Sequence, residues 1–255
     1  MIVLKTRSEL EMMREAGRIV ARILLELKER IRPGVTTGEL DKVAARVLKQ
    51  NGATSPFYNY PNHDPRLKSF PGHVCTSVNE ELVHGIPGKR VLKEGDIIKI
   101  DCGAIYEGWI GDSAWTFPVG RISDEARYLL EVTEKALYES IAAARAGNRT
   151  GDMSAALQKY VEAHNLNVVR EYTSHGVGRE LHEDPQVPNV GKAGKGAKLR
   201  PGMTIAVEPM VLAGNYKTKV LPDQWTVAAK DGKLTAHFEH TIAITDGEPE
   251  ILTKL

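Results

Sequence analysis

Apolar residues recur at helical spacing near the start of the chain and again after position 120. From Ser8 to Arg30 they keep to one face, and Ser8 followed by Glu11 has the spacing of a capping box. Thr36 and Glu39 repeat that signature before a second apolar stripe, which Gly52 is suited to end in a left-handed conformation. Similar patterns cover 123–144 and about 150–165. The sequence therefore predicts two pairs of helices.

Three segments rich in β-branched residues predict strands, at 96–101, 203–208 and 236–244. Between them and the helices, the segment from Thr54 to His73 is rich in Pro, Asn and Tyr and has no periodicity, so we expect a long loop there. Long loops in folded domains are usually binding elements or disordered. Because no flexible linker interrupts the chain, we expect one domain over residues 1–255, of the α+β class.

The two helix pairs are followed by similar strands. Arg32, Gly34, Thr37 and Gly38 recur 113 positions later as Arg145, Gly147, Thr150 and Gly151, and Leu92, Gly95, Ile98, Ile100 and Asp101 recur 107 positions later as Leu199, Gly202, Ile205, Val207 and Glu208. Such repeats predict two pseudosymmetric halves, about 1–122 and 123–255. The alternative is chance, since helix starts and buried strands commonly share Gly and Ile.

Composition narrows the function classes. Lys plus Arg is 34 and Asp plus Glu is 33, a net charge of +1, which gives no support for nucleic-acid or anionic-membrane binding. No segment approaches the ~18 uncharged residues of a membrane span. Acidic residues interrupt the first thirty positions, unlike a leader peptide, so a cytoplasmic protein is expected. Cys75 and Cys102 have no CxxC spacing, which excludes a cysteine zinc site.

Acidic residues end the predicted strands. If the chain reverses at Tyr106 and Glu107, Asp101 and Asp112 face each other in a hairpin, where like charges ~5 Å apart destabilise a sheet unless a cation compensates. The repeat places Glu208 where Asp101 lies, and Glu239 follows on the next strand pattern. Buried acids of this kind are expected to be paired or metal-bound, whereas an acid at the hairpin edge can simply face solvent.

Three histidines lie beside glycines or acids: His84, His175 and His182. Each alone is more often a structural residue than a ligand. One imidazole among carboxylates favours Mn, Fe(II), Co or Zn. The HExxH motif of helical zinc proteases and the phosphate-binding GxxxxGK[ST] loop are both absent from the sequence.

Five motifs together carry a family resemblance over nearly the whole chain: SVNEELVHGIP (77–87), DCGAIYEGWIGDSAWTF (101–117), SHGVGRELHEDPQVPN (174–189), PGMTIAVEPM (201–210) and FEHTIAIT (238–245). In this order they resemble the type I methionine aminopeptidases. The resemblance implies the pita-bread fold of creatinase and prolidase, in which a curved, mostly antiparallel sheet is covered by helices. The spacing of 33 residues between His175 and Glu208 resembles type I enzymes rather than type II.

The resemblance also implies a dinuclear site. Two divalent ions are expected, with the ligands Asp101, Asp112, His175, Glu208 and Glu239, of which Asp112 and Glu239 bridge. Glu208 is the expected general base. His84 and His182 match substrate-contacting histidines, and Cys75 and Trp225 match positions near the methionine side-chain pocket.

The implied reaction is removal of the N-terminal methionine of nascent proteins when the second residue is small, by metal-activated hydroxide attack on the first peptide bond. Family precedent favours a monomer and ribosome docking, to which Lys217 and Lys219 are candidates to contribute. Three departures from the family are a longer segment between Ser55 and Cys75, Gln224 within DQW, and Trp115.

Two other functions compete with this interpretation. One is an Xaa-Pro peptidase of the same fold, although those usually carry a large N-terminal domain and the first predicted helix here begins at Ser8. The other is an inactive homologue that binds ribosomes or RNA, although such proteins tend to lose metal ligands and every expected ligand is present.

Overall fold

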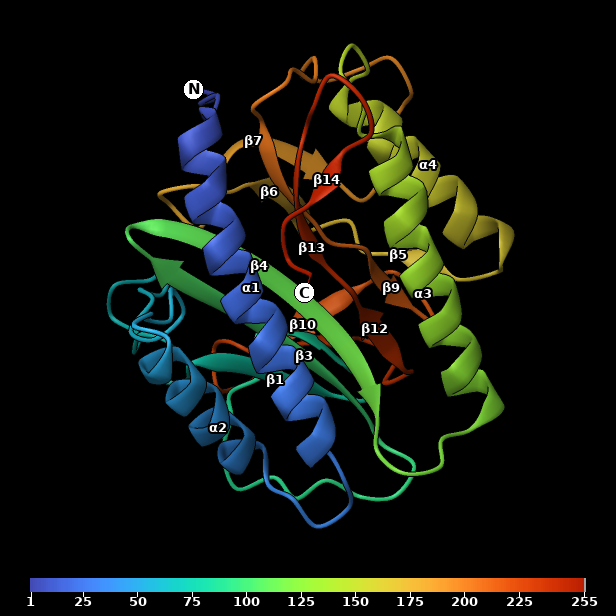
Figure 1. The fold of residues 1–255 in the computed structure, drawn as a ribbon. Coiled ribbons are helices and arrows are strands. Elements are labelled where there is room, and N and C mark those ends of the chain that lie inside the picture. The colour runs from blue at the N-terminus through green and yellow to red at the C-terminus, as the bar shows by residue number, and fades with distance from the viewer. Residues whose placement is uncertain (255) are drawn as a thin grey trace.

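Four helices cover one side of a group of antiparallel strands in the computed structural model, which describes residues 1–254 (Figure 1). The helices are α1 (Arg7–Arg30), α2 (Thr37–Gln50), α3 (Asp124–Ala143) and α4 (Thr150–Ala163). The strands are β1 (Val74–Val78), β2 (Glu81–Val83), β3 (Ile97–Tyr106), β4 (Trp109–Pro118), β5 (Asn167–Val168), β6 (Thr173–Gly176), β7 (Glu183–Pro188), β8 (Thr204–Val207), β9 (Met210–Leu212), β10 (Thr218–Val220), β11 (Val227–Ala229), β12 (Thr235–His237), β13 (His240–Ala243) and β14 (Glu250–Ile251).

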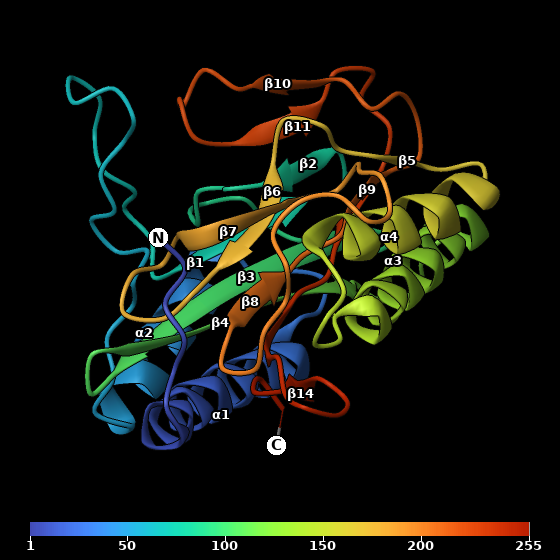
Figure 2. The same ribbon diagram turned by 90° about the horizontal axis from the view of Figure 1, so that it is seen from above.

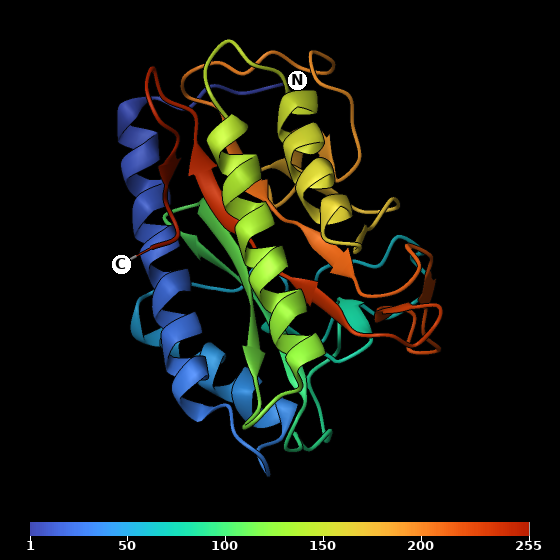
Figure 3. The same cartoon turned by 90° about the vertical axis from the view of Figure 1, so that its right-hand side faces the viewer.

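The strands form antiparallel ladders that are layered against the helices. Their orders are β1-β3-β4, β10-β11-β2, β12-β9-β5 and β14-β13-β8-β6-β7. Helix α1 packs on β3 and β4, while α3 packs on β8, β9 and β12. From above, the helices lie on one side of the strands and β10, β11 and β2 on the other (Figure 2). The side view shows α3 (yellow-green) beside α4 (yellow), with the C-terminal segments (red) between α3 and α1 (blue) (Figure 3). The predicted α+β arrangement is confirmed.

The four predicted helices are present, and the capping of the first differs from the prediction. Thr36 and Glu39 form the expected box: the Glu39 amide donates to Thr36 Oγ1 at 3.2 Å, and the Thr36 amide donates to the Glu39 carboxylate at 2.8 Å. At α1 the box is Thr6 with Glu9, so the prediction of Ser8 was wrong. Two overlapping boxes fit the sequence, and the extended chain that reaches Thr6 is held by the Lys5 amide, which donates to Gly202 O at 2.7 Å.

The hairpin of β3 and β4 turns one residue later than predicted. Glu107 and Gly108, both with positive φ (50° and 75°), form the two-residue tip. Asp112 consequently lies opposite Gly103, and Asp101 opposite Ala114, so the predicted direct opposition was wrong. When the turn moves by one residue, each residue of β3 faces a residue of β4 two positions further along. Because side chains alternate between faces, a shift of two keeps both carboxylates on one face, as diagonal neighbours.

Two strands of the second half are interrupted at the same level. The ribbon 204–212 is divided between β8 and β9 at Glu208 and Pro209, and the predicted strand 236–244 is divided between β12 and β13 at Phe238 and Glu239. Pro209 has no N–H for a ladder bond. β13 pairs with β8, and β12 pairs with β9. The segments 204–212 and 235–243 therefore stay paired as both continue from one sheet into another. Both acidic residues lie at these breaks.

The two halves repeat individual hydrogen bonds. The Gly34 amide donates to Leu92 O at 2.9 Å, and its counterpart Gly147 donates to Leu199 O at 3.0 Å. The φ angles of these glycines are 92° and 94°, a region that glycine enters without strain. Each half also has its own large core cluster. These equivalences support the proposed halves 1–122 and 123–255.

Side-chain hydroxyls join the halves where β4 meets β12 and β13. Thr116 Oγ1 donates to His237 O at 2.6 Å and accepts from the His237 amide at 3.0 Å. Thr241 Oγ1 donates to Asp112 O at 2.7 Å and accepts from the Asp112 amide at 3.0 Å. Ser113 Oγ donates to Glu239 O at 2.5 Å. The backbone beside each acid is therefore fixed without a regular ladder.

The predicted long loop is also present. Residues 54–73 contain no helix or strand, and Thr54 forms an isolated bridge to Ile105 in β3. In the view from above, this segment (cyan) projects beyond the strands (Figure 2). Among residues 1–254, no helix combines the length and apolar character needed to cross a membrane.

Candidate metal centre

A cavity of about 760 Å³ is lined by residues from both proposed halves. All site residues predicted from the sequence line it: Cys75, His84, Asp101, Asp112, His175, His182, Glu208, Trp225 and Glu239. The acids come from β3, β4 and the two strand breaks, and His175 comes from β6. The cavity therefore brings together residues that are up to 164 positions apart in the sequence.

Three side chains already have the spacing of a coordination site. Ligand atoms of Asp112, His175 and Glu239 all lie within 4.8 Å of one another. His175 Nδ1 is 2.9 Å from Gly176 O, an acceptor, so Nδ1 carries the proton and Nε2 keeps its lone pair. His175 Nε2 lies 3.4 Å from Glu208 Oε1. The imidazole thus presents a bare nitrogen to the carboxylates, as metal ligation requires.

The carboxylates have too few protein donors. Asp101 Oδ1, Asp112 Oδ1 and Glu239 Oε1 are buried without any hydrogen-bond partner. Burial, opposed by His237 and aided by the neighbouring Glu208 charge, raises the pKa of Asp101 to about 7. Burial and mutual repulsion likewise raise the pKa values of Asp112 and Glu239 well above their ordinary range. Divalent cations fit this donor set, because a positive charge offsets the repulsion among the carboxylates and gives their unpartnered oxygens a ligand to bind.

The second half fixes Glu208 and His175 relative to each other. β6 pairs with β8, with His175 opposite Ala206. The Glu208 amide donates to Ser174 Oγ at 2.9 Å, which holds the end of β8 against β6. Burial raises the pKa of Glu208 well above its ordinary range. A carboxyl with this environment is suited to accept a proton near neutral pH.

His84 enters the cavity from a rigid connection after β2. Its φ is 59°, and burial lowers its pKa to about 4, so the ring is neutral at pH 7. The next residue, Gly85, is held on both sides: Thr76 N donates to Gly85 O at 2.7 Å, and Gly85 N donates to Ser77 Oγ at 3.0 Å. A Cβ at Gly85 would lie 2.3 Å from Thr76 O, so only glycine fits there.

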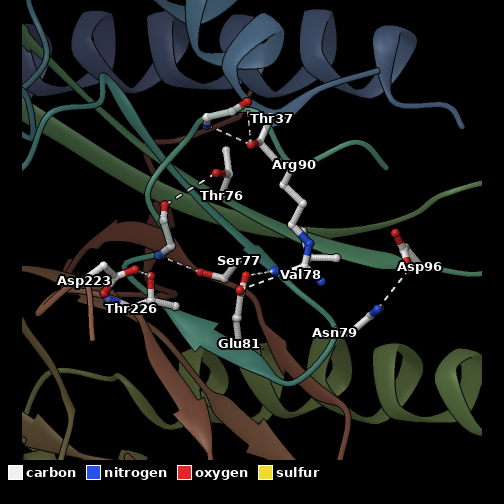
Figure 4. Close-up of polar contacts among 12 residues, drawn as sticks. Thr37, Thr76, Ser77, Val78, Asn79, Glu81, Arg90, Asp96, Asp223 and Thr226 are labelled. Atoms are coloured by element: carbon white, nitrogen blue, oxygen red, sulfur yellow. Dashed lines mark hydrogen bonds and ion pairs between the residues drawn. The ribbon is translucent and has the colours of Figure 1, made fainter. Parts of the chain in front are cut away.

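The turn before His84 is braced by charge. The Glu81 carboxylate accepts from the Val78 amide at 2.7 Å and from Arg90 at 2.6 Å (Figure 4). Asn79 Nδ2 donates to Asp96 at 2.9 Å in the same view. These bonds fix the path of the chain from β1 into β2 and so the direction of the His84 side chain.

His182 lies at the mouth of the cavity beside His175. The two rings meet edge-on with centroids 4.4 Å apart. Burial lowers the pKa of His182. Its Nδ1 lies 2.9 Å from Tyr60 Oη, so a residue of the long loop holds the ring.

Cys75 and Trp225 lie on the apolar side of the cavity. Cys75 is a free thiol opposite Asp101 in the β1–β3 ladder, and burial raises its pKa well above the ordinary value. Trp225 Nε1 donates to Lys68 O at 3.0 Å, and its ring packs edge-on against Phe70 at 5.3 Å. The loop 54–73 thus forms one wall of the cavity.

Sequence reasoning missed Tyr60 and His237. Tyr60 lies in a loop without periodicity, so nothing in the sequence placed it beside His182. His237 is 1% exposed and its Nε2 lies 3.4 Å from Glu208 Oε2. The sequence does contain a signal for His237. Residues two apart in a strand share a face, so the pattern AHFEH predicts that His237 lies on the same face as Glu239.

The model of metallopeptidase family M24 matches residues 11–246. Methionine aminopeptidase 1 of Bacillus subtilis is 55% identical over 255 residues, with 100% of both chains covered. The crystal structure of methionine aminopeptidase from Thermotoga maritima superposes with a TM-score of 0.96 at 44% identity, again with 100% of both chains covered. A prolidase from Pyrococcus furiosus shares the fold alone, with a TM-score of 0.78 at 22% identity over 99% of this chain and 66% of that chain.

The fold and the site together define a metal-dependent peptidase. The chain belongs to metallopeptidase family M24. The predicted fold, the enzyme class and the use of divalent metal are thereby confirmed.

Proposed function

We propose that the chain is a methionine aminopeptidase that removes the N-terminal methionine of nascent proteins when the second residue is small. The observation that carries this proposal is the cluster of unpartnered carboxylate oxygens around His175 in one cavity. The full-length relatives named methionine aminopeptidase support the choice of substrate.

Five residues would hold two divalent ions: Asp101, Asp112, His175, Glu208 and Glu239, with Asp112 and Glu239 bridging. When bound, such ions lower the pKa of a water toward neutrality and polarise the peptide carbonyl. The ions are Mn, Fe(II), Co or Zn, because oxygen donors with one imidazole suit hard or borderline cations.

The other residues have distinct proposed roles. Glu208 takes the proton of the attacking water and delivers it to the departing amine. We assign the proton of the 2.9 Å contact between Tyr60 Oη and His182 Nδ1 to the hydroxyl; the neutral ring then carries its own proton on Nε2, where it can donate to the carbonyl oxygen as negative charge develops. His84 lines the same cavity and would also contact the substrate, and Cys75 and Trp225 would line the pocket for the methionine side chain.

The cellular setting is proposed from the same family. We place the enzyme in the cytoplasm as a monomer that acts on chains at the ribosome. Lys217 and Lys219 are exposed on or beside β10, on the side of the molecule away from the helices, and are available to contact a ribosomal surface (Figure 2).

A peptide-release assay tests the function. Purified protein is incubated with Met-Ala-Ser and Ala-Pro-Ser peptides, with and without added Mn²⁺ or Co²⁺, after chelator treatment. The proposal requires metal-dependent release of methionine from the first peptide only. Release of alanine before proline would instead identify an Xaa-Pro peptidase, and metal binding without release from either peptide would identify an inactive binding protein.

A further inference from the structure

His237 is a buried histidine whose ring has no hydrogen-bond partner within residues 1–254. Both Nδ1 and Nε2 are shielded from solvent and unpaired. Buried polar side-chain atoms are nearly always hydrogen-bonded, so an exception next to a reactive carboxyl calls for an explanation. The nearest charged group is the Glu208 carboxylate, whose Oε2 lies 3.4 Å from His237 Nε2.

Two imidazoles flank Glu208 symmetrically. His175 Nε2 is 3.4 Å from Oε1, and His237 Nε2 is 3.4 Å from Oε2. The histidines differ in what their second nitrogen does. His175 Nδ1 is committed to Gly176 O at 2.9 Å, which leaves Nε2 without a proton. No such contact fixes His237, so its proton is free to reside on Nε2.

The backbone holds His237 firmly in this position. Its amide and carbonyl are both bonded to Thr116 Oγ1, at 3.0 and 2.6 Å. It lies opposite Met210, which follows Glu208 by two residues across the strand break. The ring therefore comes from the ribbon beside Glu208, and its backbone is fixed by the join between β4 and β12.

We propose that His237 positions Glu208 by donating its Nε2 proton to Oε2. The other oxygen, Oε1, is then left facing His175 and the cations. With the opposite tautomer, a buried N–H at Nδ1 would lack an acceptor, which disfavours that tautomer. The observed 3.4 Å is about 0.4 Å longer than an ordinary N–H···O bond, so the proposed bond requires only a small shift of either side chain.

His237 is thus a positioning residue and not a metal ligand. A proton on Nε2 leaves that nitrogen without a free lone pair for a metal, whereas the Nδ1 contact of His175 leaves its Nε2 bare. Carboxylate ligands of metals are characteristically held by a further hydrogen bond, and losing that bond typically costs about 10- to 100-fold in metal affinity or activity. The inference rests on the proposed function, since it assigns Glu208 to the metal centre.

Two variants of His237 test the proposal. In His237→Gln the side-chain amide can place an N–H where Nε2 lies, whereas His237→Leu keeps the bulk and removes the donor. Metal-stripped proteins are titrated with Co²⁺, following affinity and the visible absorption bands, and kcat and KM are measured for Met-Ala-Ser. Thermal unfolding of the metal-free proteins is the control that tests whether both variants fold.

The leucine variant is expected to lose about 10- to 100-fold in Co²⁺ affinity or kcat with little change in KM, and the glutamine variant to recover most of the loss with wild-type absorption bands. If both variants change the bands equally, His237 is itself a ligand and the proposal is wrong. If neither changes affinity, bands or kcat, it is also wrong. Wild-type protein that binds Co²⁺ but releases no methionine would overturn the proposed function instead, while the Co²⁺ titrations would still test His237.

Discussion

Tyr60 Oη lies 2.9 Å from His182 Nδ1, and the two rings meet edge-on with centroids 5.7 Å apart. This contact joins the long loop to the connection between β6 and β7, across 122 positions of sequence. It orients a ring that otherwise stands at the open mouth of the cavity. The loop therefore contributes to the site through the orientation of His182 as well as through the wall beside Trp225.

Removing the Tyr60 hydroxyl tests this contact. Tyr60→Phe is expected to lower kcat for Met-Ala-Ser by about tenfold, because the proton of His182 is no longer directed to Nε2. This decrease is smaller than the one expected when a donor to the oxyanion is removed altogether. Co²⁺ affinity is expected to stay unchanged. The matched control is Tyr58→Phe, since Tyr58 is 49% exposed and stacks on His73 outside the cavity. Equal kcat values for the two variants would remove Tyr60 from the mechanism.

Asp112→Asn should have opposite effects on the metal-free and metal-bound proteins. Without metal, the substitution relieves repulsion among the buried acids, so the melting temperature is expected to rise or hold. With Mn²⁺, the wild type gains about 2.7 kcal/mol of unfolding free energy at a concentration 100 times Kd, and the variant gains none. Calorimetry with and without Mn²⁺ measures both effects. Asp246→Asn, at an exposed position, is the control, and an undiminished Mn²⁺ response in Asp112→Asn would contradict the ligand assignment.

Metal affinity should depend on pH. Burial raises the pKa of Asp101 from 3.8 to about 7, so below that pH a cation must displace a proton, and affinity is expected to rise as pH increases through 7. Burial lowers the pKa of His175 to about 3, so its nitrogen stays available throughout. Titration calorimetry from pH 5.5 to 8.5 in buffers of different ionisation enthalpy counts the released protons. Constant affinity without proton release would contradict the prediction.

The same carboxyl affects the stability of the metal-free protein with a definite sign. A folded-state pKa above the unfolded value means that the folded chain holds a proton that the unfolded chain releases. This contribution to stability is complete below pH 3.8 and is lost as pH rises to about 7. Metal therefore stabilises the protein most at the pH where this contribution is gone.

Lys99 is expected to matter for stability. Its side chain is 1% exposed, and Nζ donates to Asn79 O at 2.7 Å and to Thr235 O at 3.0 Å, which ties β3 to segments of both halves. Lys99→Met leaves these carbonyls without a charged donor and should cost about 3 kcal/mol of unfolding free energy, measured by urea denaturation. The exposed Lys93→Met should change it by less than about 0.5 kcal/mol. Equal stability of the two variants would show that Nζ is not needed there.

Local signals predicted the four helices, three strand segments and the acidic members of the proposed ligand set, whereas His175 came from the family resemblance. The helix pairs follow from apolar periodicity and capping residues, and the repeat placed Glu208 in register with Asp101 because an acid ends both strands. Register was predicted less well. Glu107 and Gly108 form the hairpin tip because both can take positive φ, and a pattern of alternating residues does not distinguish this turn from one centred a residue earlier.

Contacts made only in three dimensions could not be predicted. The break at Phe238 and Glu239 depends on the partner ribbon, where Pro209 interrupts the ladder, and no residue in 236–244 signals it. Likewise, the contact of Tyr60 with His182 depends on how a loop without periodicity folds back over the cavity. The chemistry of the ligands was visible in the sequence, whereas the residues that orient them were not.

The proposed ligands are divided between the halves: Asp101 and Asp112 precede the boundary near residue 122, and His175, Glu208 and Glu239 follow it. Neither half by itself contains the full set. During translation, the full set of proposed ligands is present only after residue 239 has been synthesised. A fragment that stops before Glu239 lacks a proposed ligand, so such a fragment is expected to be unable to trim other proteins.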